Sequence, residues 1–377
     1  MCREDREFRL QATPVETGPD MVQRMDIIEY KLTEPVGQPM ELPKPNNTFR
    51  LFSKNPNGIS VGDGGSLPII LEDLQTAQVD MYLAPEIKLD TTQEKVINKA
   101  HRTIRAAYGR KQKSVFTSST ISFPTQHKPG GVMTLLNGDN TGRVYETGSD
   151  AFGRWTYMKL NGGAGRQLTV IATYQVCQGN VKTSGPTTAI TQQYSMHEQD
   201  HRHNPHRLRW HHSRDITNFV KQCQAEGELI VLAGDFNETL GHDATGMTKL
   251  CNDCGLVDPV FELHGCSNFN THINGTSCID YILIDPALMP AVQAAGYEAF
   301  GTHIVSDHRG VYIDVNESLF FGNATLPPPT SNPRVYNSKS PKHTVQYFEH
   351  MTAHLEDHNW FNPAQGTSVV HVHEHSQ

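Results

Sequence analysis

The sequence lacks an overall excess of positive charge and lacks any long apolar run. Its 377 residues carry 32 Lys and Arg against 40 Asp and Glu, which gives a formal net charge of -8. This balance excludes a broadly basic protein that binds duplex nucleic acid without specificity, but it allows a local basic cleft or bound cations. No apolar run reaches the length of a membrane span, and the charged first thirty residues lack a signal-peptide core. We therefore expect an intracellular protein, nuclear or cytoplasmic, with no membrane partner.

Cysteine pairs are also scarce. Seven cysteines are an odd number, and Cys251 and Cys254 form the one C-x-x-C motif. No second pair lies at the spacing of a structural zinc site, so a coincidence on one helix face is the simpler interpretation. Neither a disulfide framework nor a zinc module is predicted, and reduced thiols are expected. At this length the chain can bury one large core or two smaller ones.

Composition divides the chain into three parts. Residues 1–47 are polar and proline-bearing and predict a disordered leader with a short helix near Val22–Tyr30. Residues 48–316 alternate strand-like and helix-like patterns, which favours a layered α/β fold. Residues 317–377 predict a proline-rich linker and a weakly helical tail, with a helix over His343–His358.

The expected elements of the central part follow from hydrophobic periodicity and turn residues. Predicted strands are Thr48–Phe52, Val79–Leu83, Ser114–Thr120, Gly131–Leu136, Gly153–Leu160, Gln167–Tyr174, Leu229–Ala233, Ser277–Ile284 and Gly310–Val315. Predicted helices are Leu67–Ala77, Thr91–Tyr108, Ala189–Gln224 and Thr245–Cys254, the second of them capped by Thr91 with Glu94 closing a capping box.

The strand Leu229–Ala233 leads directly into candidate chemistry. Gly234 ends the apolar run and lets the backbone approach a neighbour closely. Asp235 and Asn237 follow at positions i and i+2, so both side chains can face one side at the mouth of a sheet. A carboxylate and an amide at this place can hold a hard cation and position a water molecule. Taken alone, the motif is equally compatible with a strand that ends in a polar turn.

Further acidic and amide residues lie at or near other predicted strands, with Asp280 inside Ser277–Ile284 and Asp307 just before Gly310–Val315. The full set is Asn55, Glu86, Asp235, Asn237, Asp280 and Asp307, the last adjacent to His308. Carboxylates gathered at one mouth repel each other unless a divalent cation neutralises them. Oxygen ligands favour Mg²⁺ or Mn²⁺ over zinc. One histidine among them can stabilise charge on a phosphoryl group.

In this order the motifs resemble the endonuclease/exonuclease/phosphatase superfamily. They are Asn-Pro-Asn-Gly at 55–58, Pro85-Glu86, Thr173-Tyr174, Gly-Asp-Phe-Asn at 234–237, Ile-Asp-Tyr-Ile at 279–282 and Ser-Asp-His-Arg at 306–309. The resemblance covers residues 48–316 and implies a four-layered α/β sandwich, with two facing mixed sheets flanked by helices.

The resemblance also implies a role for each residue. Glu86, Asn55 and Asp307 would bind the metal. Asp235, helped by Asn237, would orient or deprotonate the attacking water. His308, held by Asp280, would stabilise the charge that develops on the phosphate, and Tyr174 would hydrogen-bond a phosphate oxygen or assist the leaving group.

Several structural alternatives remain open. Asn55 and Asn57 can be plain turn residues, and Tyr174 can be packing, because Gln175-Val176-Cys177 replaces the residues that follow this tyrosine in the family. Thr271-His272 can contact substrate or form a hairpin turn. The basic stretch 201–210 can follow a nucleic-acid backbone or form a solvated helix face, and the latter is preferred.

The spacing of Asp235 and Asp307 and the tail after Val315 look most like the endonuclease module of non-LTR retroelements. This implies a Mg²⁺- or Mn²⁺-dependent DNA endonuclease that was once joined to a reverse transcriptase. The alternatives are a small-molecule or lipid phosphodiesterase or phosphatase of the same fold and a non-catalytic binding remnant.

Overall fold

The structure, a computed structural model, describes residues 34–62, 64–122, 127–242, 245–323 and 341–357. The chain forms two compact units, Met1–Thr330 and Ser331–Gln377. The helix predicted near Val22–Tyr30 lies outside the described residues. Among the helices of the described ranges, none is long and apolar enough to cross a membrane.

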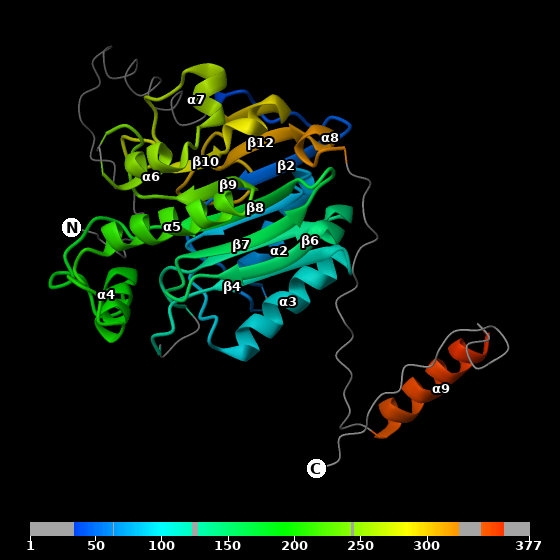
Figure 1. Ribbon diagram of the computed structural model, residues 1–377. Helices are drawn as coiled ribbons and strands as arrows, with labels where there is room; N and C mark the ends of the chain where they lie inside the picture. The colour runs from blue at the N-terminus through cyan, green and yellow to red at the C-terminus, as the bar shows by residue number, and fades with distance from the viewer. Residues whose placement is uncertain (1–33, 63, 123–126, 243–244, 324–340, 358–377) are drawn as a thin grey trace, which may run out of the picture. The chain divides into compact units, whose positions relative to one another are not determined.

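Two β-sheets form the centre of the first unit (Figure 1). The seven-stranded sheet has the order β1 (Val36–Gly37), β11 (Val292–Tyr297), β12 (Val311–Asn316), β2 (Thr48–Ser53), β3 (Met81–Pro85), β5 (Val132–Asn137) and β4 (Gln112–Thr117). The five-stranded sheet has the order β10 (Asp280–Ile284), β9 (Glu228–Asp235), β8 (Gln167–Tyr174), β7 (Trp155–Asn161) and β6 (Val144–Ser149). Each sheet contains one parallel pair, β2 with β3 and β8 with β9, so both sheets are mixed.

Helices cover the outer faces of the two sheets. Helix α3 (Glu94–Tyr108) packs against β4 and against α2 (Ser66–Thr76), while α5 (Leu208–Ala225) packs against β9 and against α6 (Gly246–Cys254). The shorter elements are α4 (Ala189–Gln199), α7 (Pro259–His264), α8 (Glu317–Phe320), η1 (Asp139–Arg143) and η2 (Pro286–Ala291). The predicted class, two facing mixed sheets flanked by helices, is confirmed.

The period-two pattern of β2 explains how the layers are held together. Phe49 and Leu51 join the large core that the two sheets share, whereas Phe52 joins a second core beneath α2 and α3. Because successive strand residues point to opposite faces, every second residue of β2 faces the other sheet. Continued past the end of the strand, this alternation directs Asn55 between the sheets.

Both predicted boundaries of the central domain need correction. Residues 34–47 were expected in the leader, but β1 pairs with β11, and Gln38 donates its backbone N–H to Ala295. At the other end, α8 follows β12 directly, and Phe320 and Phe321 are fully buried against Phe49. Both segments belong to the domain. Strand β1 extends the seven-stranded sheet beyond β11, and Phe320 and Phe321 fill the end of the large core.

Several elements differ from the sequence prediction. Helix α3 begins at Glu94 with Gln93 as its N-cap, not at Thr91, and the Gln93 side chain donates to Asp90. The long helix expected over Ala189–Gln224 is two helices, α4 and α5, separated by residues 200–207. Strands β6 and β11 and helix α7 were not predicted, because their short segments carry weak periodicity. The buried cysteines Cys223, Cys251, Cys254 and Cys278 are free thiols.

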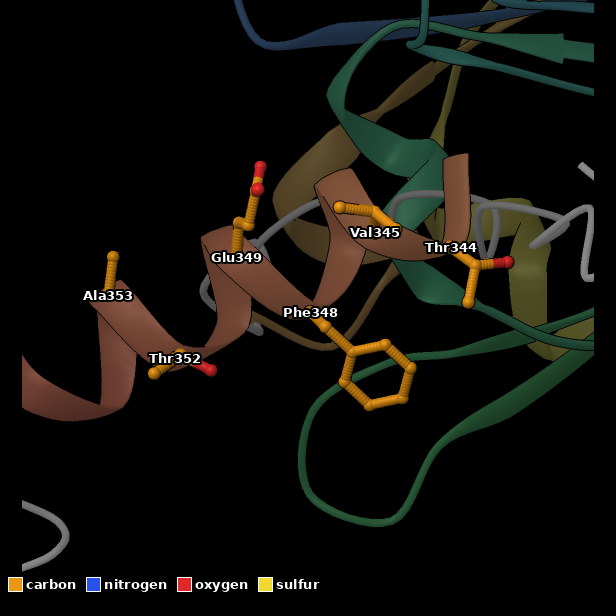
Figure 2. A pocket seen from close by; sticks show the side chains of 6 residues that line it. All are labelled: Thr344, Val345, Phe348, Glu349, Thr352 and Ala353. Atoms are coloured by element: carbon orange, nitrogen blue, oxygen red, sulfur yellow. The ribbon is translucent and has the colours of Figure 1, made fainter. Parts of the chain in front are cut away.

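The second unit is described at α9 (Pro341–Asp357), close to the predicted tail helix. One side of this helix bears a shallow hollow (Figure 2), lined by Thr344, Val345, Phe348, Glu349, Thr352 and Ala353. These residues recur at helical spacing, so the hollow is a face of a single helix and not an enclosed cavity.

Candidate active site

Three neighbouring strands align the first three candidate residues. Asp235 at the end of β9 lies directly opposite Asp280 on antiparallel β10 and opposite Tyr174 on parallel β8. Direct register partners point to the same face of a sheet, so the three side chains share one edge of the five-stranded sheet. Gly234 is required at this place, because a Cβ there would lie 1.8 Å from the carbonyl oxygen of Thr173.

His308 forms a buried pair with Asp280. Its Nδ1 lies 2.8 Å from Oδ2 of Asp280, and both side chains are almost fully buried. Ser306 fixes the approach of this segment, since its hydroxyl accepts the backbone N–H of His308 and donates to the carbonyl of Asn55. Burial alone would lower the pKa of His308, but the carboxylates of Asp280, Asp235 and Asp307 together raise it, so the imidazolium form is favoured.

Asn55 connects the two sheets at the site. Its Nδ2 lies 3.0 Å from Oε2 of Glu86, 3.0 Å from Oδ2 of Asp235 and 3.4 Å from Nε2 of His308. Its Oδ1 accepts the backbone N–H of Asn57 at 2.8 Å. Asn55 is fully buried, and its amide hydrogen-bonds Glu86, Asp235 and the backbone of Asn57, which favours a site residue over a plain turn residue.

Asp235 is a buried carboxylate with an altered acidity. Burial, and then the facing carboxylate of Asp280, raise its pKa above the usual range for aspartate. Asn237 donates its backbone N–H to Oδ1 of Asp235 at 2.8 Å, while its side-chain amide donates to the carbonyl of Gln175. Asn237 therefore holds Asp235 through the main chain, and its amide is engaged elsewhere.

Tyr174 is the last residue of β8 and the register partner of Asp235. Its side chain is nearly buried, and burial followed by the Glu86 and Asp235 carboxylates raises the pKa of its hydroxyl well above the usual value. The hydroxyl therefore stays protonated and can donate a hydrogen bond. The neighbouring Gln175 donates to the carbonyl of Phe236 and to Glu238, so this departure from the family pattern supports the loop after β9.

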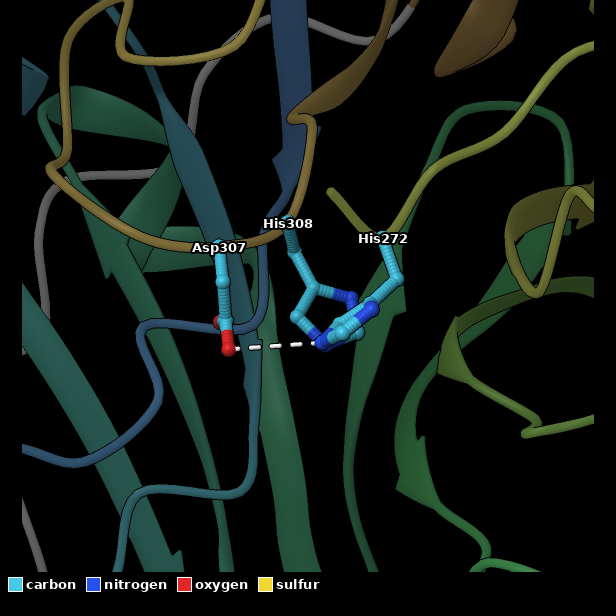
Figure 3. A group of neighbouring side chains, drawn as sticks. All are labelled: His272, Asp307 and His308. Carbon is cyan, nitrogen blue, oxygen red and sulfur yellow. Dashed lines mark ion pairs between the residues drawn. The ribbon is translucent and has the colours of Figure 1, made fainter. Parts of the chain in front are cut away.

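Asp307 lies at the more open side of the site, beside His308 (Figure 3). Its Oδ2 accepts from Nδ2 of Asn57 at 3.1 Å and lies 3.4 Å from Nε2 of His272. Although burial opposes it, the contact with His272 and the charge of His308 lower the pKa of Asp307 to about 2. Asp307 is therefore a carboxylate at neutral pH.

Lys88 is a site residue that the sequence analysis missed. Its Nζ lies 3.4 Å from Oε1 of Glu86 and also contacts Oδ1 of Asn57. Both Glu86 and Lys88 adopt a positive φ of 53°, which is unfavourable for residues with a Cβ and occurs where surrounding contacts enforce it. The Glu-x-Lys spacing directly after a strand was the available signal.

The basic stretch 201–210 is largely exposed, and two of its arginines pair with carboxylates. Arg202 pairs with Asp200 and Asp215, and Arg209 pairs with Glu238. Three histidines that flank the stretch, His197, His211 and His212, are buried. These three histidines lie outside the stretch and pack inside the junction of α4 and α5. The stretch itself is largely solvated, as preferred from sequence, but residues 201–207 lie in the loop between the two helices and not on a helix face.

The donor set fits a hard divalent cation. The site holds the four carboxylates of Glu86, Asp235, Asp280 and Asp307, with Lys88 paired to Glu86 and His308 paired to Asp280. Two groups hold ligand atoms within 4.8 Å of one another, Asp235 with Asp280 and His308, and Asp307 with His272 and His308. Glu86 belongs to neither group among the described residues and reaches Asp235 through Asn55. Oxygen donors dominate, and the excess of negative charge is what a divalent cation would offset.

A family model described as the Endonuclease/Exonuclease/phosphatase family matches residues 74–308. Among solved structures, the AP endonuclease LMAP from Leishmania major is 13% identical, with 80% of this chain and 99% of that chain covered and a TM-score of 0.51. A 3′ phosphatase, NExo, from Neisseria bound to a product DNA hairpin is 17% identical, with 71% and 99% covered and a TM-score of 0.47. The human Nocturnin catalytic domain with a bound sulfate anion is 14% identical, with 74% and 96% covered and a TM-score of 0.45.

No curated protein sequence matches the chain. At such low identity the structural likeness to the AP endonuclease establishes the fold alone. The family match extends over more than half of the chain and includes Glu86, Asp235, Asp280 and His308. The chain therefore belongs to the endonuclease/exonuclease/phosphatase family.

Proposed function

We propose that this protein is a divalent-metal-dependent phosphodiester hydrolase that acts on DNA. The observation that carries the proposal is the buried His308 imidazolium between two carboxylates, with Nδ1 2.8 Å from Oδ2 of Asp280 and Nε2 3.9 Å from Oδ2 of Asp235. An ordinary core would not accumulate such charges, since unpaired buried charges destabilise a fold. A site that stabilises charges during a reaction would account for these buried groups.

In this proposal Asp235 orients and deprotonates the attacking water. A raised pKa makes a carboxylate a better proton acceptor near neutral pH, and the backbone N–H of Asn237 keeps one of its oxygens in place. Asn55 holds the other oxygen. Asp235 thus keeps a fixed orientation toward the substrate.

His308 stabilises the negative charge that develops on the phosphate. Asp280 occupies Nδ1, so Nε2–H is directed into the site, 3.9 Å from Oδ2 of Asp235. Tyr174 supplies a protonated hydroxyl for a phosphate oxygen or the leaving group. Glu86, Asp307 and Asn55 are the proposed holders of Mg²⁺ or Mn²⁺, which when bound supplies positive charge to the phosphate.

DNA is the favoured substrate class because the sequence motifs resemble nucleases of the family and because the fold is similar to that of an AP endonuclease. The narrower retroelement assignment loses part of its basis. The start of the tail after Val315 was part of that resemblance, but Phe320 and Phe321 are core residues of the domain. The spacing of Asp235 and Asp307, the proline-rich stretch and the weak tail helix are what remain of that argument.

A cleavage panel tests the proposal. The substrates are supercoiled plasmid, abasic duplex, single-stranded DNA, RNA, sphingomyelin and inositol phosphates, each with Mg²⁺, with Mn²⁺ and with excess EDTA. We expect metal-dependent cleavage of at least one DNA substrate. Cleavage of only a lipid or an inositol phosphate would move the protein to the alternative substrate class. No cleavage of any substrate, or equal cleavage in EDTA, would contradict the proposal.

A further inference from the structure

His272 lies beside the proposed site and has no role in the mechanism above. It belongs to the loop before β10 and forms an isolated β-bridge with His308. Two backbone hydrogen bonds flank this bridge, from Ile273 N–H to the carbonyl of Asp307 and from Arg309 N–H to the carbonyl of Thr271, each 2.8 Å long. The loop is therefore held in register with the Asp307–His308 segment by main-chain contacts.

A main-chain contact also sets the position of the ring proton of His272. The backbone N–H of Asn274 donates to Nδ1 of His272 at 3.2 Å, so Nδ1 acts as an acceptor. In the neutral ring the proton must then be carried by Nε2. Nε2 faces Oδ2 of Asp307 at 3.4 Å (Figure 3), and Asn57 donates to the same oxygen from the opposite sheet.

This tautomer decides between two roles for His272. Its Nε2, the Asp307 carboxylate and His308 lie within 4.8 Å of one another, which alone is compatible with a transition-metal site. A metal would need the lone pair of Nε2, but the contact with Asn274 leaves a proton there. His272 is therefore suited to donate a hydrogen bond and not to bind a metal.

The rings of His272 and His308 also pack edge to face, with centroids 4.9 Å apart and an interplanar angle of 73°. The His272 and Asp307 side chains are 29% and 32% exposed, in contrast to the buried His308. His272 thus covers the open flank of the site. A residue that served only the hairpin turn would need the contact with Asn274 but neither the Asp307 nor the His308 contact.

We propose that His272 is a positioning residue for phosphodiester hydrolysis, which holds the Asp307 carboxylate in place through its Nε2–H. The inference rests on the proposed function, since the reaction is the one in which Asp307 takes part. Asp307 is held from one side by Asn57 and from the other by His272. Loss of one of these two donors would let the carboxylate rotate out of the geometry that the site needs.

A matched pair of substitutions separates the donor from the ring. His272→Phe keeps an aromatic ring against His308 but removes the N–H, whereas His272→Gln retains an N–H donor. We expect His272→Phe to lower kcat about 10- to 100-fold with KM little changed, which is the usual cost of losing a group that supports a site ligand. His272→Gln should restore most of this activity. His264→Phe, which changes an exposed imidazole that contacts the carbonyl of Ala295, serves as the control.

A double-mutant cycle with Asp307→Asn tests whether His272 acts through Asp307. We expect His272→Phe to have almost no further effect in the Asp307→Asn background. The same cycle is measured on the dissociation constant of Mn²⁺, followed by the electron paramagnetic resonance of free Mn²⁺. There His272→Phe should weaken binding about tenfold in the wild-type background alone.

Three results would overturn the inference: normal kcat and Mn²⁺ affinity in His272→Phe, equal defects in the Phe and Gln variants, or fully additive effects with Asp307→Asn. If the wild-type protein cleaves no substrate, the proposed function fails, and the Mn²⁺ cycle then decides the role of His272 by itself.

Discussion

Asp235 and Asp280 are register partners on adjacent antiparallel strands, so two buried carboxylates face each other across β9 and β10. Their mutual repulsion contributes to the raised pKa of Asp235. His308 relieves it by pairing with Asp280 at 2.8 Å while its other nitrogen stays 3.9 Å from Asp235. The register thus places one carboxylate to hold the histidine, and in the proposed mechanism the other acts on the attacking water.

The Asp280–His308 pair predicts a graded response to mutation. We expect His308→Ala to reduce metal-dependent cleavage about 10²- to 10³-fold, because the developing phosphate charge loses its donor. Asp280→Asn should reduce it about 10- to 100-fold, since the ring remains but loses its charged partner. Steady-state cleavage rates with DNA binding measured in parallel would check this order, and a larger defect in Asp280→Asn would contradict it.

Asp235→Asn keeps the size of the side chain and removes the proton acceptor. We expect cleavage to fall about 10²- to 10⁴-fold, the usual range for the loss of a general base, with substrate binding largely retained. Asp253→Asn, a carboxylate on α6 that pairs with Lys249, is the matched control. Undiminished nicking by Asp235→Asn would show that the water is activated by another group.

Divalent metal should stabilise the folded domain. A ligand at 100 times its dissociation constant that binds the native state alone adds about 2.7 kcal/mol to the free energy of unfolding. We expect Mg²⁺ or Mn²⁺ to raise Tm in the wild type and much less in Glu86→Gln, with Glu72→Gln on the exposed face of α2 as control. Equal shifts in all three proteins would remove Glu86 from the metal site. Activity should be lost in EDTA and retained with a zinc-selective chelator.

Because of the buried histidines between α4 and α5, we expect the free energy of unfolding to decrease as the pH falls. Burial lowers the pKa of His197 to about 4 and also lowers those of His211 and His212. Since a free histidine titrates near 6.5, the unfolded chain binds protons first as the pH falls. The stabilisation is therefore complete above about pH 6.5 and is lost progressively toward pH 4.

Urea unfolding at pH 7, 6, 5 and 4 would measure this effect. His197→Leu should unfold with a shallower dependence on pH than the wild type, by up to about one proton. His201→Leu changes an exposed histidine of the same segment and should leave the slope unaltered. The same slope in all three proteins would mean that His197 does not contribute.

Core substitutions test whether the segment after β12 belongs to the domain. Phe321 is fully buried and lies against the rings of Phe49 and Phe320, so Phe321→Ala should lower the free energy of unfolding by about 3–5 kcal/mol. Leu319→Ala, at a position that is 49% exposed, should have a far smaller effect. If chemical denaturation showed equally small effects for Phe321→Ala and Leu319→Ala, residues 319–321 would not be part of the domain core.

Part of the fold could be predicted from sequence because the signals are local. The apolar run Leu229–Ala233 and the alternation in Thr48–Phe52 both lie within strands of the structure. Short or weakly patterned elements such as β6 and α7 could not be predicted, since their stability comes from neighbours and not from their own periodicity. The aromatic pair Phe320–Phe321 illustrates the same limit, because nothing in the two residues distinguishes a core anchor from a linker.

The sequence by itself determined which residues we propose to carry the chemistry, since the types and order of Glu86, Asp235 and His308 can be recognised without coordinates. Only the tertiary structure decided how they interact. Asn55 turns its amide nitrogen to two carboxylates, Lys88 pairs with Glu86, and Asn237 acts through its backbone. The physical reason is that hydrogen-bond direction and burial depend on two sheets meeting, and contacts between strands far apart in the chain leave no local signature in the sequence.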